Sequence, residues 1–358
     1  MAPTQQLHDL GQSLWLDNIT RGLLTSGTLA RYIDELWITG LTSNPTVFDH
    51  AIKNSNDYDD AIRQKAKEGM VGEDLFFELA LEDLRQAADL FRPVYDRTGG
   101  NDGWVSLEVS PLLAHDEAGS FREARRLHAC AVRQNLFIKI PGTKEGLIAI
   151  EDSIFYGVPI NVTLLFSREQ YLAAAEAYMS GIERRIAAGR DPDVCSVASV
   201  FISRWDKAVM GKVPAELRDK LGIAIAQQTY KAYVELCQSE RWQRLVDHGM
   251  RPQRLLWAST GTKDPDASDT LYVNALAAPF TINTMPDATL LAFADHGTLG
   301  EMMPDDGGDA EATLAKFTQA GIDHDQLAAD LQREGAESFA KSWVELLATI
   351  GSRLKGFN

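Results

Sequence analysis

The stretch LFIKIPGTKEG, residues 136–146, places a lysine in the middle of an otherwise apolar β-strand. The strand is expected to stop at Pro141-Gly142, because proline lacks the backbone N–H that a sheet ladder needs. Burying an unpaired ammonium costs on the order of several kcal/mol, so folds seldom keep such a lysine without compensation. What surrounds Lys139 is therefore the first question that the sequence raises.

Segments like residues 136–141 recur along the chain and alternate with longer segments of helical period, which predicts βα units around a parallel sheet. The expected strands cover residues 14–19, 40–45, 105–110, 136–141, 160–167, 196–203, 255–260 and 280–286. Helices are expected between them, for example over residues 28–36, 121–133, 167–189 and 216–237. Eight strands with helical returns, and no GxGxxG after the first strand, favour a (β/α)8 TIM barrel over an open doubly wound sheet.

The 358 residues exceed a minimal barrel by roughly a hundred residues. We expect the surplus in a helical insertion at about 46–104, after the sixth strand, and in C-terminal helices at about 309–351. No Pro/Ser-rich linker divides the chain, so a single barrel domain over 1–358 is predicted. The sequence leaves open whether the C-terminal helix covers the barrel mouth and whether Phe357 inserts there.

The acidic composition limits the partners. A net charge of -16 and a pI near 4.9 argue against nucleic acid and anionic membranes, which require clustered cations. The N-terminus lacks a signal-peptide pattern and no window resembles a membrane span, so a cytoplasmic protein, monomeric or homodimeric, is expected. Three dispersed cysteines and seven histidines form no CxxC, HxH or HExxH motif, and the loop at 303–311 lacks calcium-ligand spacing, so no metal or other cofactor is expected.

The predicted strands have one aliphatic face and one polar face. The aliphatic positions, expected to pack under the helices, are Leu14, Leu16, Leu107, Val109, Ile138, Ile140, Ile160, Val162 and Leu164. The opposite positions carry Asp17, Thr42, Asn44, Ser106, Glu108, Ser110, Lys139, Asn161 and Thr163. This polar row is expected to face the barrel interior and its C-terminal mouth. A structural Lys139–Glu108 ion pair is the alternative, but five strands with polar groups of one parity favour a functional site.

A buried lysine among carboxylates suits class I aldol chemistry. Removal from water disfavours the ammonium form, and the neutral amine can attack a ketone and form an iminium that accepts electrons from a breaking C–C bond. Asp17 and Glu108 could move the protons. Arg204 after the sixth strand, with Ser259 and Lys263 after the seventh, suggests a phosphate site, although the segment at 259–265 could be only a polar turn. The expected substrate is a phosphorylated sugar.

The residues around these positions resemble the transaldolase family, in its longer bacterial form within the class I aldolase superfamily. The resemblance is carried by LWLDNITR (14–21), GLTSNPTVF (40–48), VSLEVS (105–110), FIKIPGT (137–143), INVTLLFS (160–167), VFISRWD (200–206) and RLLWASTGTKD (254–264). It implies transfer of a dihydroxyacetone unit from sedoheptulose 7-phosphate to glyceraldehyde 3-phosphate in the pentose phosphate pathway. The alternatives are a class I aldolase that cleaves fructose 6-phosphate and a barrel that binds sugar phosphates without turnover.

The resemblance also implies a role for each site residue. Lys139 would form the Schiff base, Asp17 would be the general acid/base, and Glu108 with Thr163 would hold the catalytic water. The remaining residues would bind substrate: Asn44 and Asn161 the hydroxyls of the dihydroxyacetone unit, Ser199 its terminal hydroxyl, and Arg204 the phosphate. Near Ser259, shorter relatives have a second arginine, for which Lys263 is the expected substitute.

Overall fold

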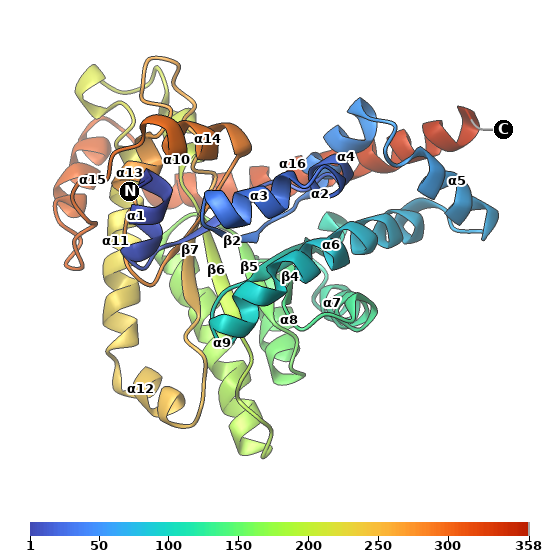
Figure 1. Ribbon diagram of the computed structural model, residues 1–358. Helices are drawn as coiled ribbons and strands as arrows, with labels where there is room; N and C mark the ends of the chain where they lie inside the picture. Colours follow the sequence, from blue (N-terminus) through green and yellow to red (C-terminus); the bar gives the residue numbers. More distant parts are fainter. Residues whose placement is uncertain (357–358) are drawn as a thin grey trace.

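The computed structural model describes residues 1–356, so Phe357 lies outside the described residues. Eight parallel strands close into a barrel in chain order (Figure 1). They are β1 (Ser13–Leu16), β2 (Ile38–Leu41), β3 (Trp104–Glu108), β4 (Leu136–Pro141), β5 (Ile160–Leu165), β6 (Ser196–Phe201), β7 (Arg254–Ala258) and β8 (Ile282–Met285). The register between β1 and β8 completes the closure. The predicted (β/α)8 TIM barrel is confirmed.

Helices surround the barrel. The first group precedes β3 and comprises α1 (Pro3–Asp9), α2 (Arg21–Thr25), α3 (Thr28–Glu35), α4 (Pro45–Asn54), α5 (Asp59–Lys67) and α6 (Gly72–Arg97). The second lies between β3 and β7 and comprises the 3₁₀ helix η1 (Pro111–Leu113), α7 (Glu117–Ala131), α8 (Lys144–Phe155), α9 (Arg168–Ala187), α10 (Ser203–Val209), the 3₁₀ helix η2 (Ala215–Leu217), α11 (Leu221–Cys237) and α12 (Glu240–Asp247). The last comprises α13 (Leu271–Ala275), α14 (Asp287–His296), α15 (Ala310–Gln319) and α16 (His324–Gly356).

Some elements end earlier or begin later than the sequence pattern predicts, because local contacts and backbone conformation set their limits. β5 ends at Leu165 and not at 167, since the Ser167 side chain accepts a hydrogen bond from the Gln170 N–H and caps α9. The helix expected from residue 216 begins only at Leu221: Asp219 has a positive φ of 57°, which interrupts the helix. Helix limits are the least predictable part of a sequence pattern because they depend on such local contacts.

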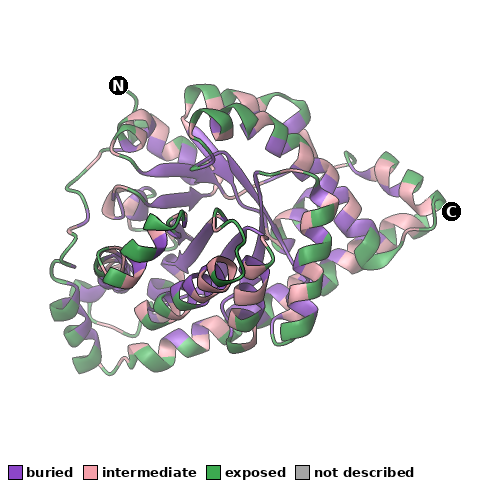
Figure 2. Cartoon of the chain, turned by 90° about the horizontal axis from the view of Figure 1, so that it is seen from below, coloured by how far each residue is buried: buried purple, intermediate pink, exposed green. Residues whose placement is uncertain are grey.

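The two faces of the strands separate as expected. All but one of the predicted outward positions belong to the large hydrophobic cluster between barrel and helices, whereas Trp15 and Phe137 belong to a second cluster inside the barrel. Figure 2 shows the strands buried throughout and the helices banded with exposed residues. Gly40 on β2 makes room for this interior packing, since a Cβ there would lie 2.6 Å from Cε2 of Trp15.

Leu164 is the exception, and its predicted outward position is wrong. It has a positive φ of 57°, and the pairing of β5 with β6 shifts between Val162 and Leu165. This irregularity turns Leu164 into the interior cluster, while Leu165 joins the outer one. A strict alternation of faces cannot anticipate such a bulge.

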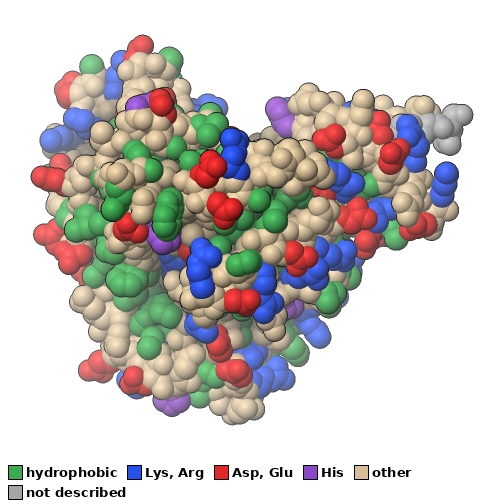
Figure 3. All heavy atoms as spheres, in the orientation of Figure 1, with side chains coloured by type: hydrophobic (Ala, Val, Ile, Leu, Met, Phe, Trp, Pro, Cys, Tyr) green, Lys and Arg blue, Asp and Glu red, His purple; other side chains and the backbone are tan. Residues whose placement is uncertain are grey.

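The C-terminal helix α16 is the longest helix of the described chain and packs against α4, α5 and α6. In Figure 1 it runs past the barrel toward the C-terminus beside α4 and α5. Within residues 1–356, no helix is long and apolar enough to cross a membrane. Figure 3 shows acidic and basic side chains interspersed over one face of the molecule. Single-domain organisation, oligomeric state and cytoplasmic location stay predictions.

Candidate active site

A cavity of about 660 Å³ opens at the C-terminal ends of the strands. Of the ten residues given a catalytic or substrate-binding role from sequence, eight line it: Asp17, Asn44, Lys139, Thr163, Ser199, Arg204, Ser259 and Lys263. Glu108 and Asn161 are buried but are not among the lining residues. Most of the predicted residues therefore meet at one cavity, at the barrel end where such folds place their sites.

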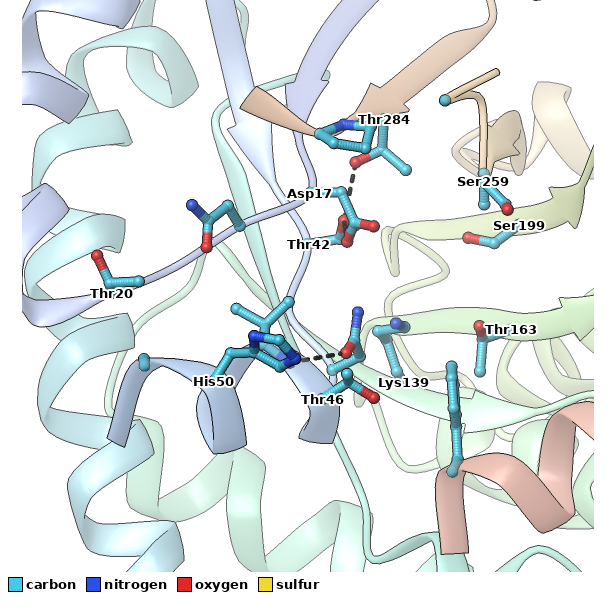
Figure 4. Close-up of a pocket in the computed structure, with 18 of the residues that line it drawn as sticks. Asp17, Thr20, Thr42, Thr46, His50, Lys139, Thr163, Ser199, Ser259 and Thr284 are labelled. Carbon is cyan, nitrogen blue, oxygen red and sulfur yellow. Dashed lines mark hydrogen bonds between the residues drawn. The ribbon is translucent and has the colours of Figure 1, made fainter. Parts of the chain in front are cut away.

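Lys139 lies on β4 with its amine in the cavity wall. Its side chain is 6% exposed, and Nζ donates a hydrogen bond to the Ser43 carbonyl at 3.0 Å. Oε2 of Glu108 lies 3.3 Å from Nζ. The ion pair proposed as a structural alternative is thus present, yet Lys139 also lines the cavity. Figure 4 shows it between Asp17 and Thr42 on one side and Thr163 and Ser199 on the other.

Asp17 follows the end of β1, and its backbone N–H donates to the Met285 carbonyl at 2.8 Å. Thr42 Oγ1 donates a hydrogen bond to Asp17 Oδ1 at 2.8 Å. Burial raises the pKa of the Asp17 carboxyl above its ordinary value of 3.8, and the charge of Lys139 opposes part of this rise. A carboxylate with a raised pKa is a stronger base than an exposed one, which suits it to accept a proton from substrate.

Glu108 lies at the end of β3, next to Lys139 in register on β4. Burial raises its pKa, while the Lys139 charge lowers it in part. Two buried oxygen atoms here have no hydrogen-bond partner among the described residues, Oε2 of Glu108 and Oγ1 of Thr163. The 3.3 Å contact of Glu108 with Lys139 is an ion pair, and the Lys139 charge favours the ionised carboxylate. Buried polar atoms without partners are rare, and they mark a place where water or a ligand binds.

The three predicted hydroxyl-binding residues lie at different depths. Asn44 caps α4, where its Oδ1 accepts a hydrogen bond from the Val47 N–H at 3.1 Å, and it lines the cavity. Ser199 on β6 also lines the cavity, and its Oγ donates to Asn161 Oδ1 at 2.7 Å. Asn161 lies beneath them, fully buried, and its Nδ2 donates to Ser106 Oγ at 3.2 Å. Asn161 therefore orients Ser199 and contributes no cavity wall.

The predicted phosphate-binding residues lie together on the cavity wall. Arg204, at the start of α10, has no carboxylate within ion-pair distance among residues 1–356, and burial lowers its pKa. Lys263 also has a lowered pKa, from burial and from the charges of Lys207 and Arg204. Ser259, with a positive φ of 56°, contacts Ser203 through the two hydroxyls at 2.9 Å. Crowded, unneutralised cations favour an anionic ligand.

Residues 14–350 match the transaldolase/fructose-6-phosphate aldolase family. The chain belongs to this family. A transaldolase of Thermobifida fusca is 45% identical over 362 residues, covering 99% of this chain and 98% of the relative. Transaldolases of Saccharopolyspora erythraea and Thiobacillus denitrificans are each 44% identical, covering 98% and 97% of this chain and 97% and 99% of the relatives. The family resemblance of the sequence, and with it the prediction of an enzyme, is confirmed.

The site of this transaldolase-family chain contains residues that the sequence prediction missed. Thr284 on β8 contacts Thr42 through the two hydroxyls at 2.8 Å, and both line the cavity beside Asp17. Thr284 lies on the inward face of the last strand, so the same parity rule that selected Thr42 could have found it. Phe339 of α16 also lines the cavity. No strand pattern signals it, because it comes from a helix far along the chain.

Proposed function

We propose that this chain is a transaldolase that transfers a dihydroxyacetone unit between sugar phosphates of the pentose phosphate pathway, with Lys139 as the Schiff-base residue. The observation that carries the proposal is the buried Lys139 amine, which lines the cavity together with Asp17 and has Glu108 at 3.3 Å. Family membership and the names of the relatives support it. A non-catalytic sugar-binding barrel would not require a buried amine with two carboxyls of raised pKa close to it.

The first step is formation of the Schiff base. The neutral amine of Lys139 attacks the ketone carbon of the donor sugar, and the resulting carbinolamine loses water to give an iminium. That loss requires a proton on the departing oxygen. Glu108 would donate that proton to the carbinolamine hydroxyl, and Glu108 and Thr163 would hold the water that leaves. The same pair would later return water to the iminium and release the product.

The second step is cleavage of the C–C bond. The ionised Asp17 takes the proton from the hydroxyl on the carbon beyond the breaking bond, and the bonding electrons move to the iminium nitrogen. The aldose phosphate leaves and an enamine of dihydroxyacetone stays on Lys139. An acceptor aldehyde then takes the enamine electrons, and Asp17 returns its proton to the new alkoxide. Asn44 and Ser199 would bind the hydroxyls of the retained unit, and Arg204 with Lys263 and Ser259 would bind the phosphate.

Borohydride reduction in the presence of fructose 6-phosphate tests the proposal. We expect one stable dihydroxyacetone adduct per chain on Lys139, located by peptide mass spectrometry. The Lys139→Met variant should give none, and Lys144→Met, a change on the surface start of α8, should react like the unmodified enzyme. Absence of the adduct from the unmodified enzyme would refute the proposed chemistry.

Adding erythrose 4-phosphate then separates the two activities in the family name. In a separate incubation without borohydride, a transaldolase transfers the enzyme-bound unit to erythrose 4-phosphate and forms sedoheptulose 7-phosphate, whereas an aldolase releases free dihydroxyacetone. We expect sedoheptulose 7-phosphate as the main product, measured by chromatography against free dihydroxyacetone. Release of dihydroxyacetone at the same rate with and without acceptor would assign the aldolase activity instead.

A further inference from the structure

The guanidinium of Arg204 lies over two aromatic rings that come from different parts of the chain. Its Cζ is 5.1 Å from the ring centroid of Phe201, at the end of β6, and 5.6 Å from that of Phe339, in α16. Both distances are within the range of a cation–π contact, which is about 6 Å. Both rings are buried, and both line the cavity with Arg204. The barrel supplies one side of this contact and the C-terminal helix supplies the other.

The contact matters because no hydrogen bond or ion pair within residues 1–356 orients the guanidinium. Among residues 1–356, no carboxylate lies within ion-pair distance of Arg204, and burial lowers its pKa. A desolvated arginine without a carboxylate partner would otherwise turn away toward water, since its side chain has many rotamers. The faces of two rings favour the cation and restrict the plane of the guanidinium, leaving its N–H groups to bind an anion.

The C-terminal helix is fixed on both sides of Phe339. Nε2 of Gln332 donates hydrogen bonds to the carbonyls of Gly142 and Leu164, at 3.0 and 2.9 Å, at the ends of β4 and β5. Nε1 of Trp343 donates to Oε1 of Glu73 in α6 at 2.8 Å. Both anchors lie within three turns of Phe339 on the same helix, so the ring is held over the barrel mouth by the helix as a whole.

The helix also approaches Arg204 closely through Gly335, one turn before Phe339. A Cβ at Gly335 would lie 3.1 Å from Nη1 of Arg204 and 3.0 Å from Cδ2 of Leu164. Those separations are tighter than ordinary van der Waals contact, so only glycine allows this approach without displacing a neighbour. The bulge that turns Leu164 inward places its side chain beneath the same turn of α16.

From these contacts we infer that Phe339 is a positioning residue: with Phe201 it holds Arg204 ready for the substrate phosphate, so the C-terminal helix sets the preference for phosphorylated sugars. This inference rests on the proposed function, because it takes Arg204 as a phosphate ligand. Phe339 itself touches no reacting atom. Its loss should therefore weaken binding of the phosphate group and leave the chemistry at Lys139 intact.

The test compares two acceptors that differ only in the phosphate, erythrose 4-phosphate and erythrose, with fructose 6-phosphate as saturating donor. In Phe339→Leu, the KM for erythrose 4-phosphate should rise about tenfold, which corresponds to about 1.4 kcal/mol of binding. The KM for erythrose and the kcat for both acceptors should change less than about twofold. Phe339→Tyr retains a ring face and should restore the KM. Val344→Ala, an exposed change on the same helix, is the matched control and should match the unmodified enzyme.

A double variant separates positioning from a general packing defect. In an Arg204→Ala background, Phe339→Leu should raise the KM for erythrose 4-phosphate no further, because the group that it positions is gone. Additive effects, equal losses for both acceptors, or an unchanged KM in Phe339→Leu would each overturn the inference. Borohydride trapping on Lys139 is the separate check on the proposed function: if trapping fails in the unmodified enzyme, that function fails, whereas normal trapping with an unchanged KM refutes only the role of Phe339.

Discussion

The two ends of the barrel interior differ in how completely their buried polar groups are paired. At the N-terminal end, Asp102 accepts hydrogen bonds from Ser13 Oγ, from Trp15 Nε1 at 2.8 Å and from its neighbouring Gly103 N–H at 3.1 Å. Arg254 donates to Ser13 Oγ at 2.6 Å and to the carbonyls of Thr281 and Asn101, at 3.0 and 3.1 Å. Every charge there has partners supplied by the protein.

At the C-terminal end, buried polar groups keep unused capacity. Oε2 of Glu108 and Oγ1 of Thr163 have no hydrogen-bond partner within residues 1–356, and Arg204 lies over two ring faces without a carboxylate partner there. Burial without full pairing costs stability, and a bound molecule can complete the pairing. The difference indicates that the N-terminal end stabilises the barrel while the C-terminal end is arranged for a ligand.

The largest effect should come from Asp17, a desolvated carboxyl at the mouth. Asp17→Asn keeps the shape but removes the base, so kcat should fall by about two to four orders of magnitude. The KM for fructose 6-phosphate should change only a few-fold, about the limit for a residue that acts mainly in the transition state. Steady-state kinetics measures both values, and a kcat within about tenfold of the unmodified enzyme would remove Asp17 from the mechanism.

Asp17→Asn should also have a larger free energy of unfolding than the unmodified enzyme at high pH. Burial raises the pKa of Asp17 above 3.8 in the folded state. The stability that this group contributes is therefore present below pH 3.8 and is lost as pH rises through the raised pKa. Asp17→Asn should be more stable than the unmodified enzyme at pH 8, and the difference should shrink toward pH 4. Urea unfolding at both pH values measures it, and an equal difference at both would contradict the raised pKa.

A substitution at the N-terminal end of the barrel should have the opposite effects, lowering stability and leaving kcat unchanged. Asp102→Ala leaves Arg254 buried without its carboxylate and removes the acceptor of Trp15 Nε1, so stability should fall by about 3–5 kcal/mol. The folded fraction should keep its kcat, because no residue of this network lines the mouth cavity. Urea unfolding and active-site titration by borohydride trapping measure the two effects.

Asp266→Ala is the matched control, since Asp266 is exposed and lies 3.6 Å from Nη2 of Arg218. An exposed pair contributes little, so this variant should lose less than about 1 kcal/mol. If Asp102→Ala does not fold, Asp102→Asn retains one acceptor oxygen and should show an intermediate loss. A loss of kcat without loss of stability in either Asp102 variant would contradict the assignment of stability to the N-terminal end and of ligand binding to the C-terminal end.

The barrel and most of the cavity wall could be predicted from the sequence. How deep each side chain lies, and which helix covers the mouth, could not. Strand parity placed Asp17, Lys139 and Thr163 on the interior face, because a strand alternates its side chains strictly. Parity gives direction and not depth, so Asn161 was expected in the wall although it lies beneath Ser199. Strand parity also gave the wrong face for Leu164, where the backbone bulges.

The positions of Leu164 and Phe339 could not be predicted because both depend on tertiary structure. Leu164 has a positive φ, and its carbonyl accepts a hydrogen bond from Gln332 in α16, a contact that no local pattern contains. Phe339 reaches the cavity because α16 crosses the barrel mouth, and the packing of a long helix against α4 and α6 is a tertiary property. Helical periodicity identifies an apolar stripe but does not say what the stripe covers.

The smallest effects are expected from two hydroxyl groups, one at each end of the barrel. Comparing their loss is the most sensitive test of the difference between the two ends. Thr163→Val at the mouth removes an oxygen that has no hydrogen-bond partner in the part of the chain that the structure describes, so stability should stay within about 0.5 kcal/mol of the unmodified value or rise slightly. Ser13→Ala at the other end removes a group that donates to Asp102 and accepts from Arg254, so it should cost about 1–3 kcal/mol. Activity should reverse the order: Thr163→Val should lower kcat about tenfold by loosening the proposed water, as expected for one hydrogen bond worth about 1.4 kcal/mol, while Ser13→Ala leaves kcat unchanged. Stability losses of equal size in both variants would mean that Thr163 already has a structural partner, and its oxygen would then be unavailable to hold that water.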